Sequence, residues 1–169
     1  MESLDIRGSN FCVSKATAAA GTTTTFSTTG ATLYCIRGKA YSTAAGANAA
    51  SPTLDAVTGA AFLPISANKG GVFVLCYTGA STAAAAIAVV QGSIEDLDGA
   101  TAGASASFIS GLPEFPGLPD TMTPFAYVVV KVGASGASWT YGASNLAGPP
   151  ANTAITFTDV MVLPDRPQA

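Results

Sequence analysis

Short runs of β-branched and aromatic residues, separated by glycine, proline, asparagine and serine, follow one another from Ala31 to the end of the chain. This alternation is typical of an all-β sandwich or barrel, because each run suits one strand and each break suits a turn. The apolar runs 72–77 and 126–132 fit strands buried on both faces of a sheet. We therefore predict a jelly-roll-like antiparallel β-sandwich. Its expected strands are residues 32–37, 39–43, 61–66, 72–77, 86–91, 107–109, 126–132, 138–141 and 154–163.

Two short segments have sequences that favour helix within this otherwise β-rich chain. The alanine run 83–86 favours helix but spans barely one turn, and so short a helix is marginal. We expect residues 79–85 to connect a hairpin of strands 72–77 and 86–91 instead. A turn or two of helix is expected at residues 51–57, where a serine, a proline and an aspartate occupy positions suited to a helix N-terminus.

Residues 1–30 are expected to form an extended N-terminal arm, and residues 31–169 a single sandwich domain. Residues 1–30 are rich in alanine and threonine, with Phe26 as their large apolar anchor. This segment buries too little apolar area to order itself alone. Phe11, Thr23 and Thr25 join Phe26 as candidate interaction residues. Such an arm adds a strand to the edge of a neighbouring sheet.

The composition argues against most enzymes. Alanine, threonine, serine and glycine make up 86 of 169 residues, and 10% of residues are charged, against roughly 25% in average domains. The chain contains no histidine. That absence removes Ser-His-Asp and Cys-His nucleophiles and imidazole zinc sites. We predict a non-enzymatic protein without a cofactor or a metal.

The charge balance argues against nucleic acid and membrane partners. The net charge is −3, and the seven lysines and arginines are scattered, whereas phosphate binding needs clustered cations. No run of 18 apolar residues is present, and the N-terminus lacks the basic start and apolar run of a secretory signal. We expect the protein to be made in a cytosol.

Three cysteines, Cys12, Cys35 and Cys76, stand far apart without a CxxC pair. Cys35 and Cys76 lie within apolar, strand-like runs. We expect buried free thiols and no disulfide.

Residues 111–120 place Leu112, Phe115 and Leu118 each directly before a proline. Proline excludes this segment from a central strand or a helix, so it is an extended crossover. Two interpretations stay open. The segment is either a long connection between two sheets, or an exposed ledge on which Phe115 and Leu118 bind a partner.

Two further features each have a structural and a functional interpretation. Glu95, Asp96 and Asp98 form either a solvated turn or a calcium site, although their spacing does not fit an EF-hand loop. Trp139 and Tyr141, two residues apart on one strand face, either pack in the core or form an aromatic stripe for carbohydrate.

Several segments in order resemble a class of tailed-bacteriophage virion proteins, the small alanine-, glycine- and threonine-rich decoration or cement proteins of the head. They are GKAYS at 38–42, PTLDAVTGAAF at 52–62, GVFV at 71–74, VVQGSIE at 89–95, FPGLPD at 115–120 and PFAYVVVK at 124–131. The resemblance covers roughly residues 31–167. It supplies no catalytic residues.

The resemblance implies a homo-oligomer, a trimer in preference to a dimer, that binds the major capsid protein on the outside of the shell. It implies that the protein bridges neighbouring capsomers and resides in the virion. Few charges and many small side chains suit such packing, because repeated weak contacts on a lattice add up. Alternatives are a tail or head-fibre component, or a carbohydrate- or cell-surface-binding module.

Overall fold

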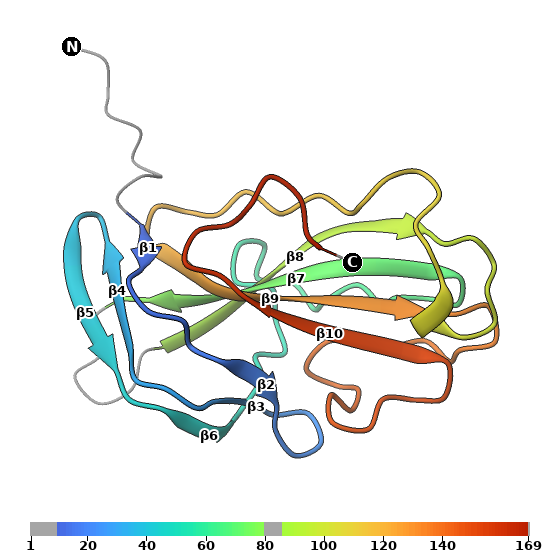
Figure 1. The fold of residues 1–169 in the computed structure, drawn as a ribbon, viewed down its shortest axis with the longest axis horizontal. Helices are drawn as coiled ribbons and strands as arrows, with labels where there is room; N and C mark the ends of the chain where they lie inside the picture. The colour runs from blue at the N-terminus through green and yellow to red at the C-terminus, as the bar shows by residue number, and fades with distance from the viewer. Residues whose placement is uncertain (1–9, 80–85, 169) are drawn as a thin grey trace, which may run out of the picture.

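The computed structural model describes residues 10–79 and 86–168, which form ten strands in three antiparallel sheets (Figure 1). The predicted all-β antiparallel fold is confirmed. The strands are β1 (Phe11–Cys12), β2 (Ala18–Ala20), β3 (Phe26–Thr28), β4 (Thr32–Ile36), β5 (Lys39–Thr43), β6 (Gly46–Ala49), β7 (Lys69–Thr78), β8 (Ala86–Asp96), β9 (Met122–Val132) and β10 (Thr153–Asp159). A short 3₁₀ turn, η2, covers Gly103–Ser105.

The central sheet has the strand order β10-β9-β7-β8. Strands β7 and β9 are its middle strands, and their β-branched and aromatic residues are buried almost throughout. The expected β7–β8 hairpin is confirmed by pairing from Lys69 with Asp96 to Thr78 with Ala86. Its expected connection is residues 79–85, of which only Gly79 lies in the described part of the chain.

Residues 11–49 build two smaller sheets, ordered β1-β4-β5 and β2-β3-β6. The expected arm therefore differs from the structure over residues 10–30, which pack on the domain. Cys12 and Ala16 are fully buried, and Phe26 is 1% exposed, because the chain's own central sheet supplies the neighbour this segment needs. Residues 1–9 lie outside the described residues.

The main core fills the space between the inner face of the central sheet and the two smaller sheets. Tyr77 stacks on Phe125 and on Tyr34, with ring centroids 4.2 and 4.6 Å apart, so the core joins residues of β4, β7 and β9. Trp139 and Phe62 enter the same core from the loops. Most of the aromatic rings lie on this side of the sheet.

The outer face of the central sheet carries a second cluster, which includes Val72, Val74, Cys76 and Val129. No strand covers it in the described part of the chain. The crossover of residues 111–121 and the C-terminal segment 160–168 lie over it instead (Figure 1). The crossover comes so near β8 that a Cβ atom on Gly92 would collide with the Glu114 carbonyl oxygen.

Three expected strands are reduced to isolated bridges, and residues 61–66 make a further one between Ala61 and Leu54. Residues 61–66 and 138–141 meet through Ile65 and Trp139, and residues 107–109 meet Leu97 through Phe108. The expected strand 154–163 ends at Asp159, beyond which the chain turns over the outer face.

The helix expected at residues 51–57 is also wrong. The Asp55 carboxylate accepts hydrogen bonds from the amides of Val57 and Thr58, at 3.0 and 2.8 Å, and closes a turn in its place.

Candidate assembly surfaces

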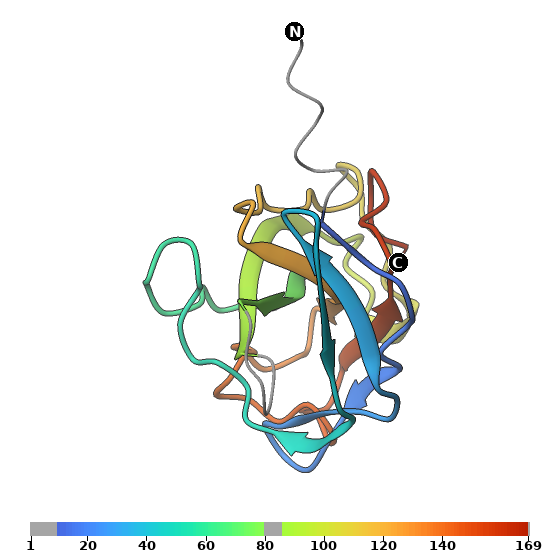
Figure 2. The same ribbon diagram turned by 90° about the vertical axis from the view of Figure 1, so that its left-hand side faces the viewer.

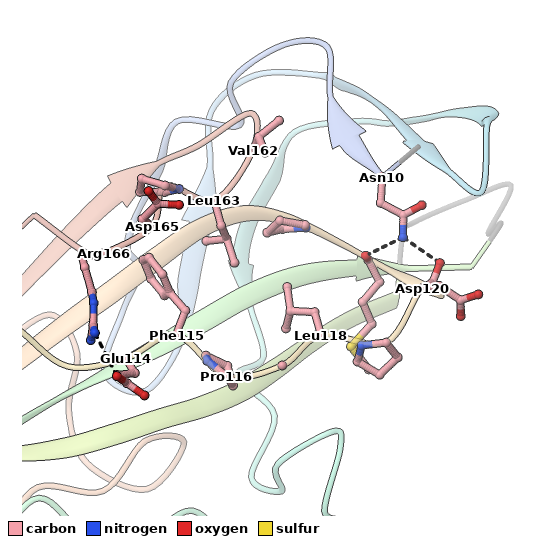
Figure 3. A pocket seen from close by; sticks show the side chains of 15 residues that line it. Asn10, Glu114, Phe115, Pro116, Leu118, Asp120, Val162, Leu163, Asp165 and Arg166 are labelled. Atoms are coloured by element: carbon pink, nitrogen blue, oxygen red, sulfur yellow. Dashed lines mark hydrogen bonds and ion pairs between the residues drawn. The ribbon is translucent and has the colours of Figure 1, made fainter. Parts of the chain in front are cut away.

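The crossover and the C-terminal segment together form a groove of about 950 Å³ (Figure 3). Its apolar lining comes from Phe115, Leu118 and Leu163, with several prolines between them. Phe115 packs edge-on against Tyr127 of β9, with 5.1 Å between ring centroids, so the groove floor rests on the central sheet. The structure brings Phe115 and Leu118 together, but both are half-buried against the sheet, whereas the ledge interpretation has them exposed. The crossover joins β8 and β9 of one sheet, so it is not a connection between two sheets either.

Two ion pairs frame this groove. Arg37 contacts Asp120 through two hydrogen bonds of 2.9 and 2.6 Å at one end, and Arg166 contacts Glu114 at 2.9 Å at the other. Asn10 donates to the backbone oxygens of Asp120 and Met122, at 2.7 and 3.1 Å. The hydrogen bond from Arg37 lowers the pKa of Asp120. The crossover 111–121 and the C-terminal segment 160–168 are here called the cover. These exposed pairs hold the cover in place more than they stabilise the fold.

A second candidate surface lies where the end of β1, strand β4 and the segment after β10 adjoin; it is here called the apolar face and is defined by Val13, Leu33 and Met161. Their side chains are 50, 52 and 43% exposed. They lie on neighbouring segments, because Val13 N–H donates to Leu33 O at 2.7 Å and Cys12 N–H donates to Met161 O at 2.8 Å. The solvent face of an antiparallel sheet is ordinarily polar, so this apolar surface is a candidate site for binding another chain.

A third surface is a projecting loop of residues 52–63, which extends from the side of the molecule (Figure 2). Leu54, Val57 and Leu63 are about half exposed or more on it. Asp55, itself 6% exposed, holds the loop to β8 by accepting a hydrogen bond from Gln91 N at 2.7 Å. Burial raises the pKa of this carboxyl, but its hydrogen bonds outweigh burial and leave the pKa lowered.

The predicted arm residues do not form one surface. Phe26 is buried in the main core and Phe11 is half-buried on β1, so Phe26 is closed to a partner. Thr23 and Thr25 lie in the tight turn between β2 and β3, where Thr25 bonds Thr22 O at 2.6 Å and Thr23 O accepts from Leu146 N at 2.7 Å. The turn is therefore attached to its own domain.

The acidic cluster is divided among separate partners. Asp96 pairs with Lys69 at 2.6 Å, Glu95 accepts from Ser93 at 2.8 Å, and Asp98 accepts from the Ala100 amide at 3.2 Å. Glu95 and Asp96 belong to β8, not to a turn after it. Among the described residues, no group of three or more acidic, cysteine or histidine side chains is placed to hold a metal ion.

Trp139 and Tyr141 are 0 and 1% exposed, which confirms the core interpretation. Trp139 donates its indole N–H to Asn145 O at 3.2 Å. A sugar-stacking platform must be exposed, so the carbohydrate alternative loses the residues on which it depended.

All three cysteines are free thiols. Cys12 and Cys76 are buried as expected, while Cys35 is only half-buried. Burial raises the pKa of Cys12 to about 12 and raises that of Cys76 as well, which makes both poor nucleophiles.

Sequence reasoning missed the apolar face and the projecting loop. Leu33 stands in a predicted strand, and apolar strand residues are expected in the core. Only the alternation of burial along β4, with Tyr34 and Ile36 inward, indicates that Leu33 faces outward.

Comparisons of this chain with protein-family models, with curated proteins and with solved structures find no match. Within residues 10–79 and 86–168, no helix has the length and apolar character needed to cross a membrane.

Proposed function

We propose that this chain is a non-enzymatic structural protein of a tailed-bacteriophage head. It binds the major capsid protein on the outer surface of the shell and bridges neighbouring capsomers. The observation that carries the proposal is the apolar face, where Leu33 of β4, Val13 after β1 and Met161 after β10 are each exposed on neighbouring segments. Such a surface gains free energy when a partner covers it.

The rest of the molecule supports a binding role over a chemical one. The Pro-rich groove at Phe115 and Leu118 offers a second surface of similar apolar character. The resemblance of residues 31–167 to decoration proteins supplies the shell as the partner and a jelly-roll-like strand order as the expected topology. The site of action is then the virion surface, after synthesis in the host cytoplasm, with no part for nucleic acid or membrane.

Co-sedimentation with purified undecorated shells tests this proposal. The wild-type chain should bind, and Leu33→Asp should weaken binding by about tenfold or more, because a charge would enter a desolvated contact. Ile109→Asp is the matched control, since Ile109 is 66% exposed in the loop after η2, where its amide donates to Asp96 O of β8 at 3.2 Å and not to β1 or β4. Circular dichroism should show both variants folded.

The result of co-sedimentation distinguishes a role on the capsid from a role in the tail or head fibres. A wild-type chain that ignores shells, or a Leu33→Asp variant that binds them as well as wild type, contradicts the proposal. Binding to purified tails or head fibres in place of shells would favour the alternative. Deleting residues 1–9 tests the terminal part of the predicted arm, whereas deleting residues 1–30 would also remove core residues such as Phe26.

A further inference from the structure

The two edge strands of the central sheet differ in what lies beside them. On β8, three contacts from loops occupy outward-facing backbone groups: Ala56 N–H to Val89 O at 3.0 Å, Gln91 N–H to Asp55 Oδ2 at 2.7 Å, and Ser93 N–H to Glu114 O at 3.0 Å. The projecting loop and the crossover therefore cap this edge. A capped edge cannot accept another strand.

The β10 edge is not capped in this way. Two contacts at the ends of the β9–β10 ladder fix which residues face β9: Val160 N–H to Phe125 O and Gly133 N–H to Asn152 O, both at 2.9 Å. Since hydrogen-bonded positions alternate in an antiparallel ladder, Ile155 and Phe157 direct their N–H and C=O groups away from β9. No other described segment bonds to these groups. Figure 2 shows β10 at the margin of the molecule opposite the projecting loop.

We propose that β10 pairs antiparallel with β10 of a second copy of this chain, which joins two four-stranded sheets into one of eight strands. Residues 153–158 carry no charge, so two copies meet there without repulsion despite a net charge of −3 each. The half-buried side chains of Ile155 and Phe157 become covered in the pair. This inference does not depend on the shell.

The register follows from what flanks the strand. At its C-terminal end, the Asp159 carboxylate accepts a hydrogen bond from Ala18 N at 2.7 Å, and β2 lies beside β10 there. At its N-terminal end, Thr153 N–H donates to Pro150 O at 3.1 Å. The open stretch is therefore residues 154–157 together with the Thr153 carbonyl group. A two-fold axis at Ile155 places Thr153 of one copy opposite Phe157 of the other.

The capped edge also sets the number of copies. Pairing of identical edges through a two-fold axis closes after two chains, and the contacts on β8 prevent further growth of the sheet. The structure therefore favours a dimer, where the family resemblance implies a trimer.

Sedimentation velocity of the full chain is the experiment that tests this pairing. The wild type should sediment as a species of twice 16.7 kDa. Ile155→Pro removes an N–H group that faces away from β9, and should weaken dimerisation by about tenfold or more while the β9 ladder remains. Thr156→Lys, at an exposed edge position, should act in the same direction. Thr101→Lys adds the same charge at an exposed site in the loop before η2 and should leave the dimer intact.

Amide hydrogen exchange of the wild-type chain gives a second measurement, which does not require any variant to fold. Exchange at Ile155 and Phe157 should slow as protein concentration rises, because their N–H groups become bonded in the dimer. A wild type that stays monomeric across a wide concentration range overturns the proposal. So does a dimer that Thr156→Lys leaves unchanged, or exchange at Ile155 that is independent of concentration. None of these measurements involves shells, so their failure is separate from failure of the capsid role.

Discussion

The two faces of the central sheet both exclude water, but different structures close them. On the inner face, Phe73 lies 5.1 to 5.7 Å, between ring centroids, from Phe62, Trp139 and Tyr141. On the outer face, valines and Cys76 lie beneath a cover whose large side chains, such as Phe115, are only half-buried.

The inner face contributes more to stability, and the outer face is covered less tightly. The inner face is closed by interlocked rings, and a change there alters packing that cannot relax fully. The outer cover is an irregular chain held at its ends by the exposed Arg37–Asp120 and Arg166–Glu114 pairs. Because exposed pairs of this kind contribute little free energy, we expect the cover to open at lower cost than the inner face.

Trp139→Ala should give the largest effect, because it opens a cavity on the inner face. The loss in free energy of unfolding should be about 3–5 kcal/mol, as for other large-to-small core changes. The substitution also removes the indole donor to Asn145 O. Equilibrium unfolding in guanidinium chloride measures the loss. A loss below about 1 kcal/mol would show that the inner aromatic cluster does not dominate stability.

Phe115→Ala should cost less, about 1–2 kcal/mol, because the ring is half-buried and only part of its apolar area leaves water on folding. The same unfolding titration compares it directly with Trp139→Ala. The variant should also expose the Tyr127 ring, which gives a fluorescence change without unfolding. A loss equal to that of Trp139→Ala would mean that the cover is as tightly packed as the inner face.

The sequence allowed the central strands to be predicted because their burial is encoded locally. Residues of β7 and β9 are apolar in succession, and that pattern suits a strand covered on both faces whatever its neighbours are. Strands β2 and β3 have three residues each and carry no such pattern. Phe26 is buried by Phe125, 99 positions away, at 6.3 Å between ring centroids, so its environment depends on the completed fold.

The candidate surfaces also differ in whether a local sequence pattern predicts them. Phe115 and Leu118 were identified because a proline after each excludes regular structure, which is a local rule. Leu33 was missed because an apolar strand residue is core or surface according to which face the rest of the chain covers. The open edge of β10 was also beyond prediction, since it depends on the loops that cap β8 and leave β10 uncapped.

The smallest expected effect comes from two buried tyrosines, one on each face, that differ in their hydroxyl contacts. Tyr127 accepts a hydrogen bond from Gln168 N at 2.8 Å under the outer cover. The Tyr141 hydroxyl on the inner side is buried without a hydrogen bond of good geometry. Tyr127→Phe should therefore cost about 1 kcal/mol, whereas Tyr141→Phe should leave stability unchanged or raise it slightly.

The pH dependence makes this last comparison sharper. Burial raises the pKa of Tyr141 to about 12, against about 10 in an unfolded chain. The neutral phenol's contribution to stability is thus complete below pH ~10 and is lost as pH rises through 12. Tyr141→Phe should reduce the alkaline loss of stability, measured by unfolding titrations between pH 8 and about 11. An alkaline profile identical to that of wild type would show that the Tyr141 hydroxyl reaches solvent and that the inner face is less closed than its packing indicates.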